Sequence, residues 1–481
     1  MKGKTEKVKF SENETKTTLQ TLSLEPNVRR YPAHKSSDAM NSDRISELPD
    51  PLLTQILSHL PIIDSVKTSV LSKRWESLWP NVSTLDLNDR DISPPYKKLF
   101  ASFIDSFLEH NFESRLQRLE IKYDECNANP FPISEWISTA VDLRGIKHLV
   151  VEIRNPMYVI DFTPKSVYKS ETLVSLRLGR VRVRNLVEVD DVVSLPCLKI
   201  MRLENVCYGK EGDLCVEKLI SGCPVLEDLD LVRKCNDLVK TLRVRSRSLK
   251  MFRLEFRLGM GGGTEYEVEI DAPALEYMSF KDSQSDRIVV KNLSSLVKID
   301  VDSEFNVKVG DGEIDLTKSD TIRDFLIGVS SVRQMIISEP TLEILYRYSK
   351  LVPVAEFQRL HHLQAAFSSS SLLFLPAFLE SCPNLKNLVL DFSVSTESEQ
   401  INLTDVPRCL RSTLECVEIN KLIMREETGI KLVNYFLENA AVLKKLSLSF
   451  TDSPMADEDL DIYKGLLTPI KRSRICQVFI S

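Results

Sequence analysis

Six histidines and ten cysteines are the side chains of this sequence that most readily bind metals or act as nucleophiles. The histidines, at positions 34, 59, 110, 148, 361 and 362, lack the His-Glu-x-x-His spacing of zinc enzymes. No Cys-x-x-Cys pair occurs, and the group at 207, 215, 223 and 235 is spaced too widely for a typical zinc site. We therefore expect no metal, and thiols that serve as small core residues.

Catalytic motifs are also missing from the sequence. The glycine-rich stretch 259–264 lacks the Lys-Ser/Thr of a phosphate-binding loop and is expected to be a flexible hairpin or loop between strands. No Gly-x-Ser-x-Gly elbow and no set of kinase motifs is found. The sequence thus predicts a protein that is not an enzyme and has no cofactor, so its chemistry should be that of binding.

Residues 44–80 hold the densest signal for binding. Leu52, Leu53, Ile56, Leu57 and Leu60 recur at helical spacing, between a start at Asp50-Pro51 and a stop at Pro61. Asp64 and Ser72 are suited to begin two further short helices, the last of which carries Trp75, Leu78 and Trp79. So short a segment cannot bury this apolar surface by itself. Its neighbour is either the rest of the chain or another protein.

The same segment, residues 41–81, resembles an F-box. The resemblance is carried by Ile45-Ser46-Glu47-Leu48-Pro49 and by Ser69-Val70-Leu71-Ser72-Lys73-Arg74-Trp75 with Leu78-Trp79. It implies a Skp-type adaptor as partner and, through the adaptor, a cullin ubiquitin ligase. The expected adaptor-binding residues are Leu48, Pro49, Leu52, Leu53, Ile56, Leu57, Leu60, Val70, Leu71 and Trp75. We expect the face from Leu48 to Leu60 to stay exposed, and Leu78 and Trp79 to pack on the first repeat near residues 82–87.

Residues 82–400 repeat a short unit, Leu-x-x-Leu-x-Leu with conservative exchanges. Copies begin at Val82, Leu116, Ile146, Leu173, Leu198, Leu226, Leu249, Leu275, Leu296, Val332 and Leu385, with a weak one at Leu360 and further ones at Leu414 and Leu443. From Leu116 to Leu296 the interval is 21 to 30 residues. This period predicts an irregular leucine-rich-repeat solenoid with a parallel sheet. We expect a loop with a short helix over 302–331 and a helix over 342–352.

The positions between the leucines should line an exposed concave surface, because a strand alternates its faces. Candidates for target binding there are Arg177, Arg202, Asp228, Asp230, Arg253 and Tyr277. A solvated sheet face of mixed charge is the alternative explanation.

Residues 401–481 resemble the FBD domain that often ends plant F-box proteins. The resemblance is carried by Val406-Pro407-Arg408-Cys409-Leu410, by an expected helix near 428–439 and by an expected closing strand near 473–479. Physically, its last strands could cap the open end of the repeats.

Residues 1–40 are polar and expected to be disordered. The predicted fold class is therefore α/β: a three-helix F-box, a repeat solenoid and an α/β cap.

The net charge and the composition of the N-terminal segment narrow the remaining classes of function. The net charge is −6, which gives no case for nucleic acid or a membrane surface. No apolar secretory segment occurs near the N-terminus, so a reducing compartment, the nucleus and/or cytoplasm, is expected.

The expected function is substrate recognition in an SCF-type (Skp-cullin-F-box) ubiquitin ligase, with an unknown target protein. One alternative is an F-box scaffold that acts without degradation. The other is a small-molecule co-receptor, for which Arg177, Arg202, Arg243, Arg245 and Arg253 would supply a basic pocket.

Overall fold

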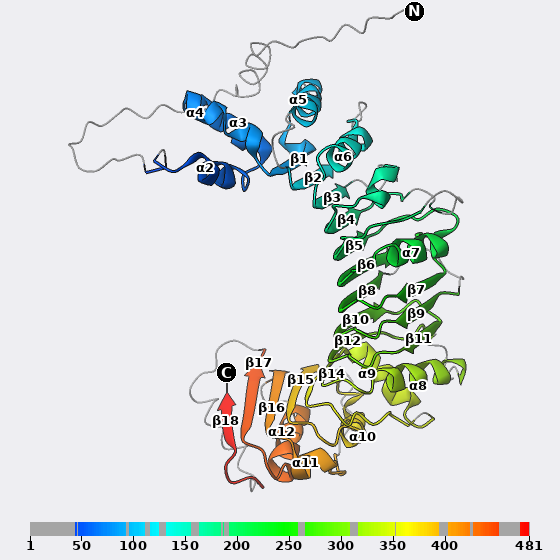
Figure 1. The fold of residues 1–481 in the computed structure, drawn as a ribbon. Coiled ribbons are helices and arrows are strands. Elements are labelled where there is room, and N and C mark those ends of the chain that lie inside the picture. The colour runs from blue at the N-terminus through cyan, green and yellow to red at the C-terminus, as the bar shows by residue number, and fades with distance from the viewer. Residues whose placement is uncertain are drawn as a thin grey trace, which may run out of the picture. The chain divides into compact units, whose positions relative to one another are not determined.

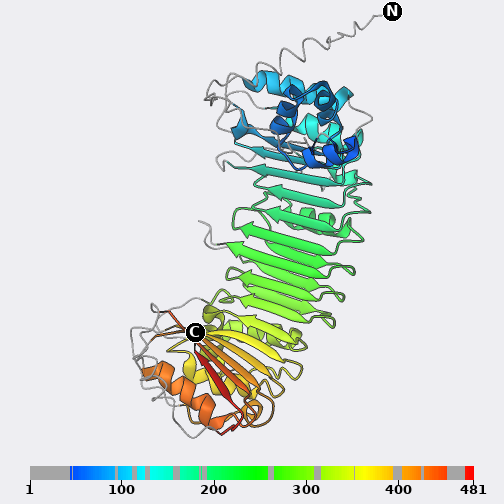
Figure 2. The ribbon, with the colours of Figure 1, turned by 90° about the vertical axis from the view of Figure 1, so that its left-hand side faces the viewer.

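The computed structural model describes residues 44–45, 47–92, 96–110, 116–124, 131–154, 163–183, 186, 192–257, 265–307, 316–351, 353–393, 403–423, 427–451 and 472–480. The predicted disordered tail 1–40 and the glycine-rich stretch at 259–264 lie outside these residues. The chain divides into two compact parts, Met1–Gly209 and Lys210–Ser481. Each part is described by itself (Figures 1 and 2).

The first part begins with short helices and continues into a parallel sheet. Its helical segment consists of α2 (Asp50–Leu57), α3 (Ile62–Lys67), the 3₁₀ turn η1 (Thr68–Val70), α4 (Lys73–Glu76) and η2 (Trp79–Asn81). The sheet has the order β1 (Thr84–Asn88), β2 (Arg118–Tyr123), β3 (His148–Ile153), β4 (Ser175–Gly179) and β5 (Ile200–Glu204). The segments between these strands contain η3 (Asp89–Asp91), α5 (Lys97–His110), α6 (Ile133–Asp142) and η5 (Lys165–Lys169).

The second part continues the same design. Its main sheet has the order β6 (Asp228–Lys234), β8 (Met251–Arg257), β10 (Tyr277–Asp282), β12 (Lys298–Asp302), β13 (Gln334–Ile337), β14 (His362–Ser368), β15 (Asn387–Ser393), β16 (Cys416–Leu422), β17 (Lys445–Phe450) and β18 (Gln477–Ile480). Its helices are α7 (Gly212–Ser221), η6 (Leu316–Lys318), α8 (Ser319–Gly328), α9 (Glu339–Tyr348), η7 (Leu372–Phe374), α10 (Leu375–Glu380), α11 (Arg408–Ser412) and α12 (Glu427–Asn439). Figure 1 shows the main strands stacked side by side, with helices along one face.

Each predicted repeat copy coincides with a main strand, which confirms the solenoid. In β2, Leu119 and Ile121 are buried while Arg118, Glu120 and Lys122 remain partly exposed. This alternation follows from the two-residue period of a strand. Because strands pair in parallel and in register, the inward leucines of successive repeats stack into one continuous core. The copy at Leu360, which looks weak in the sequence, forms the full strand β14.

A second sheet was not predicted. β7 (Thr241–Arg245), β9 (Glu267–Asp271) and β11 (Arg287–Lys291) form a three-stranded parallel sheet in the order β11-β9-β7. In this stretch the return segments between main strands are strands instead of helices. An extended residue covers about twice the length of a helical one, so the short intervals between Leu226 and Leu296 suffice. The sequences of these three strands do alternate between apolar and polar residues, which is the pattern of a strand, but they lack the leading leucine of the repeat unit.

The regions that interrupt the repeats contain the predicted helices. α8 and η6 lie in the 302–331 stretch, of which residues 308–315 are outside the described part. α9 covers most of the predicted 342–352 helix but begins three residues earlier, because Ser338 caps it through a hydrogen bond from the Thr341 N–H. The C-terminal strands β16, β17 and β18 extend the repeat sheet in order, so the cap is built from the same sheet.

Candidate protein-binding surfaces

Arg74 fixes the start of the helical segment. Its Nε donates to Asp50 Oδ1 at 2.8 Å and its Nη2 donates to the Leu48 carbonyl at 2.5 Å. Asp50 is the first residue of α2, and Pro49 occupies the cap position. The Asp50 carboxylate thus joins α2 to Arg74 on α4. The sequence did not reveal this contact, because 24 residues separate the two charges.

Two hydroxyl groups tie the other end of α2 to its surroundings. The buried Ser65 hydroxyl donates to the Leu57 carbonyl at 2.8 Å. The Ser58 hydroxyl accepts a hydrogen bond from the Ser83 N–H at 3.0 Å, just before β1. The helix is thus held at both ends, and its side chains have defined directions.

α2 has one buried and one exposed apolar face. Leu53 and Leu57 are 0% and 1% exposed, whereas Leu52 and Ile56 are 47% and 46% exposed. Residues four apart share a helix face, so each pair forms its own stripe. The prediction that the whole Leu48–Leu60 face stays exposed is wrong for Leu53 and Leu57, because they form the core beneath the helix. Leu60, after the end of α2, is exposed as predicted.

The turn between η1 and α4 exposes a second apolar pair. Val70 and Leu71 are 73% and 66% exposed. Trp75, which was expected among the adaptor-binding residues, is only 8% exposed and packs within its own chain. Its side chain is therefore not an exposed contact.

The expected contact with the first repeat exists. Leu78 is buried, α3 contacts β1, and Trp79 packs its ring 5.5 Å from Phe103 and 6.2 Å from Phe107. Both phenylalanines lie on α5, the return helix of the first repeat. The helical segment is thus fused to the solenoid core through aromatic packing.

In the first part, the open face of the sheet, defined by the outward strand positions, carries mostly paired charges. Arg118 and Lys122 each contact Glu120 at 2.6 Å. Burial alone would raise the pKa of Glu120, but its hydrogen bonds from these two cations hold the pKa below its usual value. Arg177 and Arg202 are exposed and lie directly opposite each other on β4 and β5, as predicted.

In the second part, the open face brings Arg253 together with three of the other predicted target-binding residues. Its Nη1 lies 2.7 Å from Asp228 Oδ1, its guanidinium lies 5.6 Å from the Tyr277 ring centre, and Asp230 stands opposite it in register. Asp228 is only 6% exposed. The prediction of Asp228 as an exposed contact is wrong, since the carboxylate is covered and positions Arg253 instead.

Arg243, Arg245 and Arg253 do not form the basic pocket that the small-molecule alternative would need. Arg243 and Arg245 lie on β7, in the three-stranded sheet, whereas Arg253 lies on β8 of the main sheet. Arg245 contacts Glu217 at 3.1 Å and Glu269 at 3.0 Å. These arginines are thus bound to carboxylates on another face and do not converge with Arg253.

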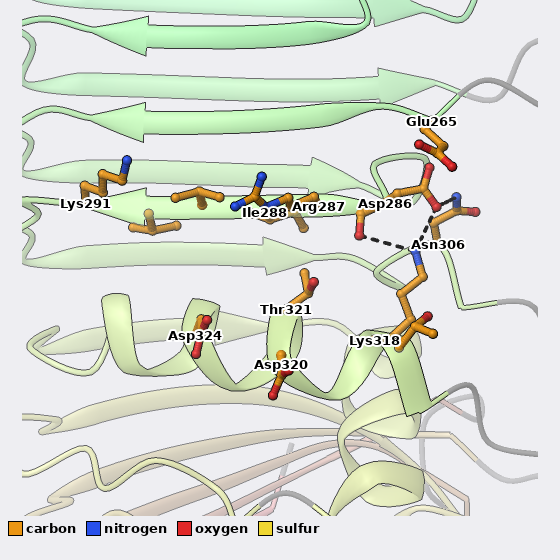
Figure 3. Close-up of a pocket in the computed structure, with 13 residues that line it drawn as sticks. Glu265, Asp286, Arg287, Ile288, Lys291, Asn306, Lys318, Asp320, Thr321 and Asp324 are labelled. Atoms are coloured by element: carbon orange, nitrogen blue, oxygen red, sulfur yellow. Dashed lines mark hydrogen bonds and ion pairs between the residues drawn. The ribbon is translucent and has the colours of Figure 1, made fainter.

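A groove of about 740 Å³ runs between β11 and α8 (Figure 3). Its charges are largely paired: Lys318 contacts Asp286 at 2.8 Å and Lys291 contacts Glu269 at 3.1 Å. Asn306 also donates to Asp286 at 2.9 Å. The groove is therefore held together by its own ion pairs and hydrogen bonds.

The described cysteines range from buried to exposed, and the described histidines for which burial is given are exposed or half-buried. Cys215 and Cys223 are buried, and burial raises the pKa of Cys223 to about 12. Cys207 and Cys235 are half-buried. Across the described ranges, no group of three His, Cys, Asp or Glu side chains is placed to hold a metal ion. None of the helices described here is long and apolar enough to span a bilayer.

Fold and surface together define a leucine-rich-repeat protein with an N-terminal helical segment that exposes apolar side chains. Family models match three stretches: the F-box domain at 45–86, the LRR repeats of the FBD-associated F-box protein At5g56370 at 133–300, and FBD at 401–448. The matches fall on α2 to β1, on α6 to β12, and on α11 to β17.

Relatives from Arabidopsis thaliana cover nearly the whole chain. The protein At5g44950, named for an F-box, FBD and LRR repeats, is 58% identical over 92% of this chain and 100% of its own length. The F-box/FBD/LRR-repeat protein At2g26030 is 57% identical with the same coverage. The FBD-associated F-box protein At5g27750 is 46% identical over 91% of this chain and 98% of its own. The chain belongs to the F-box/FBD/LRR-repeat family.

Proposed function

We propose that this protein is the substrate-recognition subunit of an SCF-type ubiquitin ligase. The observation that carries the proposal is the exposed apolar set on the folded F-box helices: Leu52, Ile56, Leu60, Val70 and Leu71. Such a cluster costs free energy in water and is typical of a surface that a partner covers. The F-box family match makes a Skp-type adaptor that partner, and a cullin follows through the adaptor.

The predicted adaptor-binding residues divide into two roles. Pro49, Leu52, Ile56, Leu60, Val70 and Leu71 are exposed, and Leu48 is half-buried, so these side chains can reach a partner. Leu53, Leu57 and Trp75 are buried and keep the helices in place. In this proposal the first group enters a groove of the adaptor, and the second positions it.

The open face of the repeats binds the target protein in this proposal. The chain then brings the target near the ubiquitin-carrying enzyme and raises its effective concentration, while the chemistry is done by partners. The predicted borders, with the F-box at 41–81, the repeats at 82–400 and the FBD domain at 401–481, belong to the same proposal. So does a location in the nucleus and/or cytoplasm.

Adaptor binding is tested by placing charges in the exposed stripe of α2. The double variant Leu52→Glu/Ile56→Glu should weaken binding of a purified Skp adaptor about a hundredfold or more, since each buried anchor is worth about 2 kcal/mol. The variant Leu48→Ala/Pro49→Ala should also lose co-purification with the adaptor. Gln55→Glu is the control, because Gln55 is exposed on the same helix and gains one of the two negative charges that the double variant gains.

Both double variants should keep the circular dichroism spectrum of the wild type. Undiminished adaptor binding by Leu52→Glu/Ile56→Glu would refute the docking surface. Proximity labelling with and without proteasome inhibition then identifies targets. A target whose level and ubiquitination do not depend on the chain would point to a scaffold without degradation.

A further inference from the structure

A second groove, of about 710 Å³, lies where three neighbouring strands of the second part begin. It is lined by Arg333, Gln334, Arg359, His361, His362 and Asn387. Each of these side chains carries an N–H group, and none carries a carboxylate. We call these six residues the donor groove.

The sheet register places the donors in a row. Gln334 stands opposite His362, which stands opposite Asn387, so the three outward side chains are about 4.8 Å apart from strand to strand. Backbone hydrogen bonds fix the turns just before these strands: the His361 N–H donates to the Arg333 carbonyl at 3.0 Å, and the Asn387 N–H to the His361 carbonyl at 2.9 Å. The row is therefore part of the rigid sheet, at the N-terminal ends of three interior strands.

The loop that carries Arg359 is also held in place. The Phe357 N–H donates to the Ser381 carbonyl at 2.8 Å, and the Leu360 N–H donates to the Phe357 carbonyl at 3.1 Å. His361 Nδ1 lies 2.5 Å from the Arg359 carbonyl, which adds a contact within the groove wall. Little ordering of the backbone remains to be done when a ligand binds, which favours affinity.

Among the residues that the structure describes, neither Arg333 nor Arg359, the two cations of the donor groove, has a carboxylate within ion-pair distance. Nearby carboxylates are already paired, Glu356 with Arg408 at 3.0 Å and Glu415 with Lys444 at 2.8 Å. The groove between β11 and α8 differs in this respect, because Lys318 contacts Asp286 (Figure 3) and Lys291 contacts Glu269.

We propose that the donor groove binds an acidic segment of the target protein through carboxylate or phosphate groups. The proposal rests on the proposed function and names the chemistry of the substrate. Arginine forms paired, charge-assisted hydrogen bonds with both anions, and the amides of Gln334 and Asn387 and the imidazole of His362 add donors beside them. Lys298 extends the row, since it stands opposite Gln334 on β12.

The test uses fluorescence anisotropy of the full chain with labelled ten-residue peptides. One peptide alternates Glu and Ser, a second carries phosphoserine at the same serines, and a third replaces Glu by Gln. We expect the two acidic peptides to bind, more weakly as salt increases, and the Gln peptide to bind at least about tenfold more weakly. The ratio of the two acidic peptides shows whether phosphate or carboxylate is preferred.

The decisive variant is Arg333→Glu/Arg359→Glu, which should lose about tenfold or more in affinity for the acidic peptides. The matched control is Arg247→Glu/Arg411→Glu, which makes the same charge change at two exposed arginines outside the groove. Equal losses in both variants would overturn the proposal, as would acidic peptides that bind no better than the Gln peptide. Tighter binding of a labelled oligonucleotide, lost in the first variant, would reassign the groove to nucleic acid.

The chain's own acidic run at 457–461, Asp-Glu-Asp-Leu-Asp, is a competing occupant. If its replacement by Asn and Gln raised peptide affinity about tenfold, the assignment to a separate protein would be overturned. Adaptor binding measured in parallel separates this inference from the proposed function. If the wild-type chain binds the adaptor but no acidic peptide, only the assignment of the groove is refuted. If the wild-type chain does not bind the adaptor, the proposed function is refuted.

Discussion

At the scale of single residues, buried polar groups in the second part fix the turns that follow main strands. Arg233, 3% exposed, contacts Asp237 at 2.7 Å and stacks 4.3 Å from the centre of the Phe256 ring. Its Nη2 also donates to the Val239 carbonyl at 2.5 Å. The pair therefore closes the turn between β6 and β7, where the chain changes from one sheet to the other.

Asp282 closes the turn after β10 in a similar way. It is fully buried and accepts hydrogen bonds from the Gln284 N–H at 2.8 Å, the Ser285 N–H at 3.0 Å and the Ser285 hydroxyl at 2.6 Å. Burial raises the pKa of Asp282, although these hydrogen bonds favour the charged form. The turn thus depends on a carboxyl group in a dry environment.

Replacing Asp282 tests its role as a hydrogen-bond acceptor in the turn and the effect of its raised pKa on stability. Asp282→Ala should lower the free energy of unfolding by about 2–3 kcal/mol, because buried N–H groups lose their acceptor. Asp282→Asn keeps an oxygen acceptor and should cost less. Urea unfolding followed by circular dichroism at pH 7 measures both.

The same variants give a pH dependence. Because the pKa of Asp282 is raised in the folded state, the folded chain holds the proton more tightly than the unfolded chain. Wild type should therefore gain stability relative to Asp282→Asn as pH falls from 7 through this raised pKa. Equal stability differences at pH 7 and pH 5 would show that the carboxyl is not titrating in this way.

At the scale of elements, α2 is a helix with two apolar faces. Leu53 and Leu57 hold it to the chain, while Leu52 and Ile56 face outward. An exposed apolar stripe costs free energy in water, and in our proposal a partner covers it. The hydroxyl contacts of Ser58 and Ser65 keep the stripe in place without that partner.

Single alanine variants on α2 should separate the two faces. Leu57→Ala should lower the free energy of unfolding by about 2–5 kcal/mol, because it leaves a cavity in the core. Ile56→Ala should change it by less than about 0.5 kcal/mol, since the side chain is half exposed and alanine favours helix. Denaturation followed by tryptophan fluorescence is suitable, because Trp75 and Trp79 lie in this segment. Similar costs for both variants would contradict the two-faced helix.

At the scale of the whole molecule, stacking makes each strand the cover for its neighbour. β18 is the last strand of the second part and pairs with β17 from Lys445 to Leu448. The buried Ser473 hydroxyl donates to the Leu443 carbonyl at 2.6 Å just before this strand. Solenoids need covered ends, because an open sheet edge pairs with other chains.

Removal of residues 472–481 should therefore expose the edge of β17. We expect concentration-dependent association and a lower unfolding temperature, measured by light scattering and calorimetry. A chain without Ser481 alone serves as the control and should behave as the wild type. A shortened chain that stays monomeric with an unchanged unfolding temperature would show that β18 does not act as a cap.

Much of the element inventory could be predicted from the sequence. The repeat copies became main strands, and α8, α9 and α12 appeared close to their expected positions. Such features depend on local periodicity, which a sequence displays directly. The sheet of β7, β9 and β11 was missed because its strands alternate without the leading leucine that marked the repeats.

The sequence by itself determined that this chain has F-box helices, a solenoid and a C-terminal cap, because stacked repeats must bury their leucines against one another. Only the tertiary structure decided which apolar residues face outward: Trp75 turned inward, while Ile56 stayed exposed. It also separated Arg243 from Arg253 and brought Arg333 beside His361. These outcomes depend on pairing between distant segments, where register and burial are set by the packed core and not by spacing along the chain.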